Sequence, residues 1–218
     1  MIIIFNPDRL TRQHFFQDLI NYLYQVEGAT LKQIKEQFPT VEQIERLLEH
    51  YRQAGYLLYQ DKHYLIGFAL LESLSHLTLD KQIFVNTNSQ IFPQLLTLPF
   101  ETKLTNATNR LILLEHTTIS RDNLTLANYF FKLQQDLPLS DLQKSLYALL
   151  GDVNPEYALK YMTTFLLKFS RKDQVIQKRT DVFVKALELL GYIHQNEERK
   201  YELLMDFNRD TLVFRSRL

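Results

Sequence analysis

A short pattern that occurs twice is the strongest constraint on how this chain can fold. In each copy, a helix with apolar residues at helical spacing ends at a Gly-Tyr pair, Gly55-Tyr56 or Gly191-Tyr192, and two apolar arms around a polar tip follow. Glycine accepts the left-handed backbone that ends a helix, and an aromatic residue after it anchors the reversed chain. The helix positions that coincide are Leu47, Leu48, Tyr51 and Ala54 in the first copy and Phe183, Val184, Leu187 and Leu190 in the second. We therefore predict two related helix-hairpin modules, the alternative being two unrelated junctions.

The residues before the first corner predict three helices. Residues 11–26 place apolar side chains three and four positions apart, which is typical of a helix with one buried face. Thr30 caps a second, shorter helix that Pro39 stops, and Thr40 begins a third helix that continues to Gly55.

This order of elements resembles the winged-helix superfamily over residues 9–70. The segment GATLKQIKEQFPTVEQIERLLEHYRQAGYLLYQ would contain the second helix, the turn, the helix at the recognition position and the first strand of the wing. The resemblance implies a fold that other proteins use to bind DNA. A three-helix bundle with the same apolar stripes is the alternative.

The carboxyl-terminal half predicts at least four helices. Asn154 followed by Pro155 is a strong start signal, because asparagine caps the first turn and proline fits the first helical position. Between the halves, β-favouring runs such as KQIFV and RLILLEH predict two or three strands with a short helix at residues 91–96. The expected fold is therefore α+β but mainly helical, with two winged-helix-like units joined by a small mixed α/β segment. The expected boundaries are 1–78 for the first winged-helix-like domain, 79–119 for the connecting segment and 120–218 for the helical, winged-helix-like second domain.

Three segments, NLTLANYFFKL, LGDVNPEYALKYMTTFLLKF and ALELLGYI, are similar to a protein family of streptococci and related low-GC Gram-positive bacteria that has no assigned activity. This resemblance lies mostly in the second half of the chain. It implies a bacterial cytosolic protein and carries over no functional site.

The composition excludes several classes of site. The chain has no cysteine, which removes disulfides, thiolate nucleophiles and cysteine-ligated metals. It has five glycines, and they lie too far apart in the sequence for a phosphate-binding loop. No apolar stretch reaches the roughly 20 residues that span a bilayer, and the apolar amino-terminal run is shorter than a signal-peptide core. We expect a cytoplasmic protein with no cofactor and no membrane partner.

The best candidate for nucleic-acid binding is the stretch KFSRKDQVIQKRT, although the whole chain has 25 basic and 25 acidic residues. The cations of this stretch outnumber its single acid, Asp173. Lysine and arginine pair with phosphates, and glutamine can reach a base edge. The predicted binding residues are Lys168, Arg171, Lys172, Gln174, Lys178 and Arg179. The expected partner is double-stranded DNA, and a solvated connection without a ligand is the alternative.

The third predicted helix favours a protein partner instead. Its sequence places Glu42, Glu45 and Glu49 against Arg46 and Arg52, so phosphate would be repelled from its outer face. Such a unit would pack on protein, either the second unit or the matching unit of a homodimer. The two leading hypotheses are a non-enzymatic, DNA-associated or transcription-regulatory protein and a module that binds only protein.

A third hypothesis is a metal-dependent nuclease centred on the middle segment. Asp80 with Glu101 and Lys103 has the outline of the carboxylates and lysine that hold a divalent cation and polarise a phosphate. Glu115 and His116, at the end of a predicted strand, would pair a general base with its orienting group. Both patterns are commonly structural, and we expect no catalytic residue and no metal site.

Aromatic residues recur at helical spacing in the second half of the chain. Stripes of this kind are far more often core than base-stacking surfaces, so we expect these side chains to be buried. They are Phe130, Phe131, Tyr157, Tyr161, Phe165 and Phe169.

Overall fold

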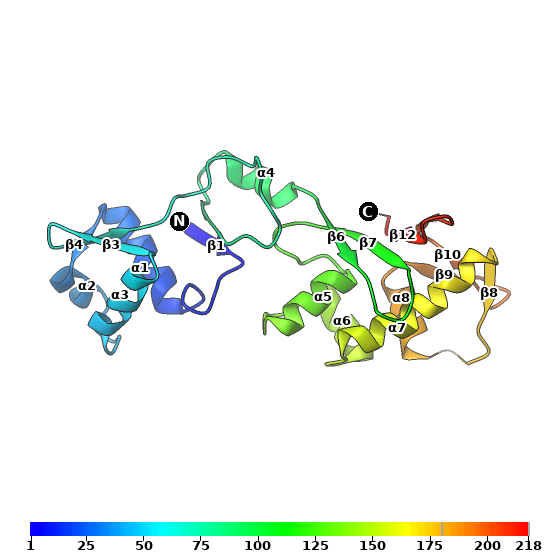
Figure 1. The fold of residues 1–218 in the computed structure, drawn as a ribbon. Helices are drawn as coiled ribbons and strands as arrows, with labels where there is room; N and C mark the ends of the chain where they lie inside the picture. Colours follow the sequence, from blue (N-terminus) through cyan, green and yellow to red (C-terminus); the bar gives the residue numbers. More distant parts are fainter. Residues whose placement is uncertain (180, 218) are drawn as a thin grey trace. The chain divides into compact units, whose positions relative to one another are not determined.

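The computed structural model describes residues 1–179 and 181–217 (Figure 1). The chain divides into two compact units, Met1–Thr97 and Leu98–Leu218. Each unit has a hydrophobic core of its own.

The elements of the first unit are β1 (Ile2–Phe5), α1 (His14–Val26), β2 (Ala29–Thr30), α2 (Leu31–Gln37), α3 (Ile44–Gln53), β3 (Leu57–Gln60), β4 (His63–Ile66), β5 (Ile83–Asn86) and α4 (Ile91–Thr97). Those of the second unit are β6 (Phe100–Leu104), β7 (Ile112–Thr117), α5 (Leu126–Gln134), α6 (Asp141–Leu150), α7 (Pro155–Leu166), the 3-10 turn η1 (Leu167–Ser170), β8 (Gln174–Ile176), α8 (Val182–Leu189), β9 (Ile193–Gln195), β10 (Lys200–Leu203), β11 (Asp206–Asn208) and β12 (Val213–Arg215).

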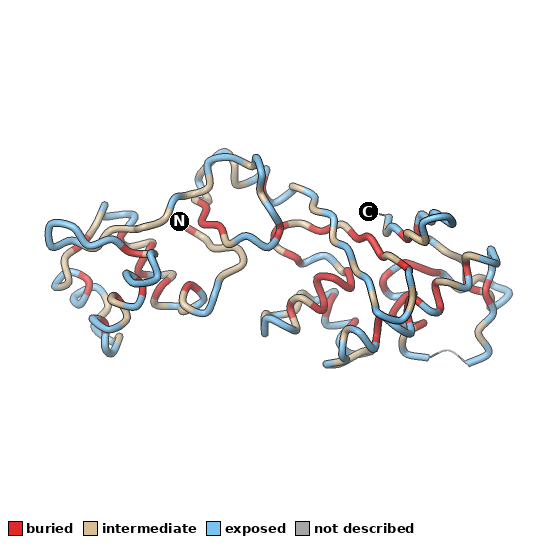
Figure 2. The backbone as a smooth tube through the Cα atoms, viewed as in Figure 1, coloured by how far each residue is buried: buried red, intermediate tan, exposed pale blue. Residues whose placement is uncertain are grey.

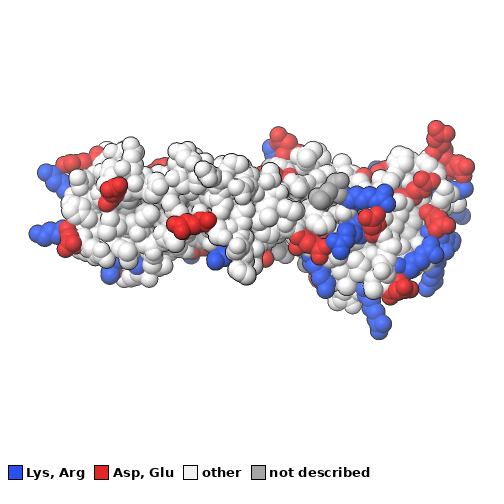
Figure 3. All heavy atoms as spheres, turned by 90° about the horizontal axis from the view of Figure 1, so that it is seen from above, with Lys and Arg blue, Asp and Glu red and all other residues white. Residues whose placement is uncertain are grey.

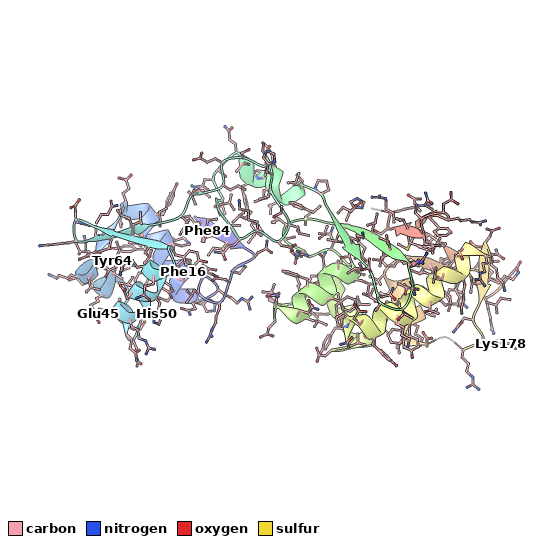
Figure 4. The ribbon with its side chains drawn as sticks, in the orientation of Figure 1. Phe16, Glu45, His50, Tyr64, Phe84 and Lys178 are labelled. Atoms are coloured by element: carbon pink, nitrogen blue, oxygen red, sulfur yellow. The ribbon has the colours of Figure 1, made fainter. Side chains whose placement is uncertain are left out.

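The first unit packs α1, α2 and α3 with a three-stranded sheet of order β2-β4-β3, and β1 pairs with β5 in a separate antiparallel ribbon. Tyr56 joins the two parts of the core. Its ring centroid lies 5.4 Å from that of Phe16 and 6.0 Å from that of Phe84. Figure 4 labels these two phenylalanines. The ribbon that β1 and β5 form therefore packs into the same core as the helices.

Both Gly-Tyr corners are confirmed as helix-to-hairpin junctions. Gly55 (φ 82°) and Gly191 (φ 71°) have the left-handed backbone that ends a helix. The N–H of the following tyrosine, Tyr56 or Tyr192, donates to the carbonyl oxygen five residues earlier, at 2.9 Å in both cases. The two hairpins, β3-β4 and β9-β10, follow directly.

The returning arms and the tyrosine hydroxyls repeat as well. The Tyr56 carbonyl accepts the N–H of Gly67, eleven positions later, at 2.8 Å. The Tyr192 carbonyl accepts the N–H of Leu204, twelve positions later, at 2.9 Å. This difference is the extra residue expected in the second hairpin. Each hydroxyl donates to a carboxylate, Asp8 in the first unit and Glu115 in the second. The two corners are thus anchored in the same way.

Gly67 closes the base of the first hairpin by a close approach of backbone to backbone. A Cβ at this position would lie 2.7 Å from the Gly55 carbonyl oxygen and 3.2 Å from the Leu57 backbone. We expect Gly67→Ala to lower the free energy of unfolding of the first unit by about 2 kcal/mol, because the hairpin must open to admit the methyl group. Urea denaturation would measure this loss.

The control is Gly55→Ala, at the other side of the same corner. A Cβ there meets nothing within 4 Å. Only the positive φ disfavours alanine, which costs about 1 kcal/mol. A Gly67→Ala protein no less stable than the Gly55→Ala protein would contradict the steric account.

In its described residues, the second unit combines two sheets with four α-helices and the 3-10 turn η1. The larger sheet has the order β11-β12-β7-β6, in which β12 runs parallel to β7 with Val213 opposite Ile112. The smaller sheet has the order β8-β10-β9. Buried positions run along β7 and through the helices of this unit (Figure 2). The core joins side chains from both sheets and from α5, α6, α7 and α8.

The expectation of a mainly helical chain is wrong, and the expected winged-helix-like units are not shown. Over residues 1–179 and 181–217 the structure is α+β, with 37% helix and 21% strand in four sheets. The strands of residues 98–117 and the carboxyl-terminal strands β11 and β12 form one sheet across the second unit. Pairing between strands about 100 residues apart leaves no local sequence signal, because it depends on the tertiary contacts of both strands.

Several local predictions have definite outcomes. The short helix near residues 91–96 is confirmed as α4, and the asparagine cap before Pro155 is confirmed by the 3.1 Å bond from the Tyr157 N–H to the Asn154 side chain. The third helix begins at Ile44 and not at Thr40, because the residue before Ile44 has left-handed backbone. Within residues 1–179 and 181–217, none of the helices has the length and apolar character needed to cross a bilayer.

Candidate functional site

The predicted basic stretch begins where α7 tightens into η1. The Ser170 hydroxyl donates to the Leu167 carbonyl at 2.7 Å, and the Arg171 N–H donates to the Lys168 carbonyl at 3.2 Å. The chain then enters β8, which pairs with β10 through Val175 and its neighbours. Lys168, Arg171 and the residues between them are therefore held by local backbone geometry.

A cavity of about 750 Å³ lies against this stretch. Three of its described lining residues are cations, and none of them is an aspartate, a glutamate or a histidine. Apolar side chains from β8 and from the turn before β12 complete the wall. The lining residues are Thr164, Leu167, Lys168, Ser170, Arg171, Lys172, Gln174, Val175, Ile176 and Leu212. We call this hollow the basic cavity.

The cations of the basic cavity keep their charge available to a ligand. Among the described residues, neither Arg171 nor Lys172 forms an ion pair with a carboxylate. Lys168 donates to the neutral side-chain oxygen of Gln177 at 2.9 Å and lies 4.8 Å from the centroid of the Phe165 ring. An anion entering the cavity would therefore meet cations without displacing a carboxylate.

The single acid of the stretch is neutralised from outside it. Asp173 accepts from Arg209 at 3.1 Å, and both side chains are exposed. Exposed pairs of this kind contribute little to stability. Because Asp173 is paired with Arg209, its carboxylate competes less with a ligand for the neighbouring cations.

A smaller hollow of about 360 Å³ shares Lys172 and Gln174 with the basic cavity. Its wall includes Glu202, which accepts from the Gln174 amide at 2.8 Å and from the Asn196 amide at 2.9 Å. The Gln174 amide is thus already engaged by a carboxylate. This side of the stretch is less favourable for an anion than the basic cavity itself.

The structure brings together four of the six predicted binding residues. Lys168, Arg171, Lys172 and Gln174 line the basic cavity, whereas Lys178 and Arg179 lie in the connection from β8 to α8 and are outside its lining. Lys178 lies at the outer edge of the unit (Figure 4). On the face drawn in Figure 3, basic and acidic side chains are mixed over this unit. The candidate site is therefore defined by the cations that line the basic cavity and not by a uniformly positive surface.

The acidic face of α3 is organised by ion pairs in the first unit. Glu45 pairs with Lys35 at 2.5 Å, and Glu49 pairs with Arg52 at 2.8 Å. The hydrogen bond from the Arg52 guanidinium lowers the pKa of Glu49 to about 2. These carboxylates stay ionised at neutral pH and leave this helix without an excess of positive charge for phosphate.

Glu115 is buried inside the second unit. Its carboxylate accepts the N–H groups of Leu126 and Ala127 at 2.9 and 2.8 Å and the hydroxyl of Tyr192. Burial raises the pKa of Glu115 to about 7, and the two backbone N–H groups act against that rise. A carboxylate that caps α5 and anchors the second corner is placed to stabilise the fold, because no substrate reaches a fully buried group.

Glu101, a residue of the predicted nuclease pattern, contacts basic groups of the second unit. This carboxylate pairs with Arg215 and lies 3.9 Å from His116 Nε2. Within the described ranges, no group of three or more aspartate, glutamate or histidine side chains is arranged to hold a metal ion. Glu101 therefore has a cation and an imidazole as its neighbours.

Comparison with known protein families gave a match over the first unit. Residues 2–98 match the family model described as a domain of unknown function (DUF1803). The match covers nearly the whole first unit and stops before the basic cavity begins in the sequence. It agrees with the expected likeness to an uncharacterised family, although that likeness was based on the second half. The search of curated proteins and the search of solved structures each found no match.

Two residues of this site could not be predicted from the sequence. Leu212, in the turn before β12, lines the basic cavity, and Arg209 neutralises Asp173. Both come from the carboxyl-terminal strands, whose pairing was not expected. Tyr157 and Tyr161, expected in the core, are 52% and 40% exposed. The sequence shows that these two tyrosines lie four residues apart on one helix. It does not show which side of α7 the rest of the unit leaves exposed.

Proposed function

We propose that the second unit binds the phosphate backbone of a nucleic acid at the basic cavity, and that the protein is a cytoplasmic, non-enzymatic nucleic-acid-binding protein. The observation that carries this proposal is the convergence of Lys168, Arg171 and Lys172 on one cavity, where none of the described lining residues is a carboxylate. Lysine and arginine provide most protein contacts to phosphate oxygens. Freedom from competing ion pairs lets these three side chains release counterions from the nucleic acid.

The apolar part of the cavity is compatible with the same ligand. Val175, Ile176 and Leu212 form a wall next to the cations. Sugars and bases present apolar surface beside each phosphate, whereas inorganic phosphate does not. A polymer of nucleotides therefore matches both kinds of lining better than a small inorganic anion does.

The test is binding of the full chain to a short fluorescein-labelled oligonucleotide at low ionic strength, followed by fluorescence anisotropy. Single-stranded and duplex forms of one sequence should be titrated in parallel. We expect saturable binding of at least one form. Failure to bind either form at the lowest salt concentration would remove the proposal.

A protein partner is the second candidate function, and the first unit gives the observation that favours it. β3 is an edge strand of its sheet and exposes Leu58 and Tyr59, at 45% and 52%. Exposed apolar residues on an edge strand are typical of pairing with another chain. Sedimentation of the full chain over a range of concentrations would show whether that partner is a second copy.

A further inference from the structure

An aromatic cluster lies exposed on the second unit, where α7 faces α8. The rings of Tyr161 and Phe183 are stacked at 5.2 Å with an interplanar angle of 7°, and Tyr157 meets Tyr161 at 4.8 Å with an angle of 60°. Both tyrosines retain large exposed areas. We call these three residues the aromatic platform.

The aromatic platform and the basic cavity belong to one face of α7 and its extension. Tyr157, Tyr161, Thr164 and Lys168 are separated by four, three and four residues, which is the spacing of one helical face. Thr164 and Lys168 line the basic cavity. At about 1.5 Å per residue in α7 and about 2 Å per residue in η1, Tyr157 and Lys168 lie about 17 Å apart along the axis. A ligand of a few nucleotides can therefore reach both sites.

We infer that the nucleic acid bound by this protein is single-stranded, with its phosphates at the basic cavity and its bases stacked on the aromatic platform. This inference rests on the proposed function and specifies its ligand. Bases in a duplex are stacked on their neighbours and offer no free ring face, whereas the bases of a single strand do. Positively charged grooves with aromatic side chains beside them are the usual means of binding single strands without sequence preference.

Charge favours a nucleic acid over a protein on this face. Lys160 lies 5.6 Å from the centroid of the Tyr161 ring. Lys168, Arg171 and Lys172, which form no ion pair among the described residues, follow along the chain. The aromatic platform is thus flanked by cations, which complements a polyanion with flat apolar groups. A neutral protein surface would leave these cations without partners in the interface.

The test compares Tyr161→Leu and Tyr157→Leu with Tyr147→Leu in the full chain. Leucine keeps an apolar side chain but removes the ring face. Tyr147 is the matched control, because it is 40% exposed, as Tyr161 is, and lies on α6 outside the aromatic platform. Each platform variant should weaken binding of a labelled single strand about tenfold or more, and Tyr147→Leu less than about twofold. The unmodified protein should bind the single strand more tightly than the duplex of the same sequence.

The outcomes separate the inference from the function on which it rests. Binding of duplex as tight as that of single strand, with platform variants like the control, would overturn the inference and leave the proposed function standing. No binding of either form would overturn both. Loss of self-association by the platform variants, with unchanged affinity for the single strand, would assign the platform to a protein interface and overturn the inference. Thermal melting should confirm that each variant folds, and Tyr157→Leu, at the more exposed position, still provides the test if Tyr161→Leu does not fold.

Discussion

Replacing Glu115 by alanine should lower the free energy of unfolding of the second unit by about 3 kcal/mol or more. The substitution would leave the N–H groups of Leu126 and Ala127 and the hydroxyl of Tyr192 without their common acceptor. Each buried donor left unpaired costs about 1 to 3 kcal/mol, and the cavity left by the side chain adds to that. Urea denaturation followed by circular dichroism would measure the loss.

The control for this change is Glu101→Ala on the neighbouring strand β6. Glu101 is about half exposed and pairs with the exposed Arg215. A surface pair of this kind contributes about 1 kcal/mol or less. The account of Glu115 as the anchor of the second corner would be wrong if both variants lost the same small amount.

The pH dependence of stability provides an independent check on Glu115. Its pKa is about 7 in the folded protein and near the usual 4.5 when unfolded, so the folded state binds the proton more tightly. The contribution of a raised carboxyl pKa is fully present below pH 4.5 and is lost as pH rises to about 7, on the order of 3 kcal/mol. The difference in stability between the native protein and Glu115→Gln should therefore change over this range. A difference that stays constant would contradict the assignment.

Charge reversal at Arg171 and Lys172 together should weaken nucleic-acid binding about 100-fold or more at low salt. Each substitution removes a phosphate contact and puts a repelling carboxylate in its place. Neither side chain forms an ion pair among the described residues, so the thermal melting temperature should change little. Anisotropy titrations of the double variant would give the affinity.

Its matched control is Lys144→Glu with Arg217→Glu, which changes the net charge by the same amount. Lys144 and Arg217 pair with Asp141 and Asp206, away from the lining of the basic cavity. We expect only a small loss of affinity in this control, through the weaker overall field. Equal losses in both double variants would show that binding depends on net charge and not on the basic cavity.

The Gly-Tyr corners could be predicted from the sequence because their signals are local. A glycine at a helix end, an aromatic residue after it and a polar hairpin tip all lie within a short segment. The carboxylate that each corner tyrosine contacts could not be predicted in this way. Tyr192 reaches Glu115 across 77 residues, and only the folded core determines that meeting.

The candidate site likewise combines residues that are close in the sequence with residues that only the tertiary fold brings together. Lys168, Arg171 and Lys172 are close in sequence, so their gathering on one surface was predictable from the pattern of charge. The wall formed by Leu212 depends on the parallel pairing of β12 with β7. The exposure of Tyr157 and Tyr161 depends on how α8 covers α7, and apolar spacing along a single helix does not contain that information.

The salt dependence of single-strand binding is the decisive check on phosphate binding at the basic cavity. If Lys168, Arg171 and Lys172 each neutralise one phosphate, the logarithm of the binding constant should fall against the logarithm of salt concentration with a slope of about 2, at about 0.7 per phosphate. The variant with both charges reversed should show a much shallower slope. A slope near zero for the unmodified protein would contradict phosphate binding at the basic cavity, as would no binding at the lowest salt.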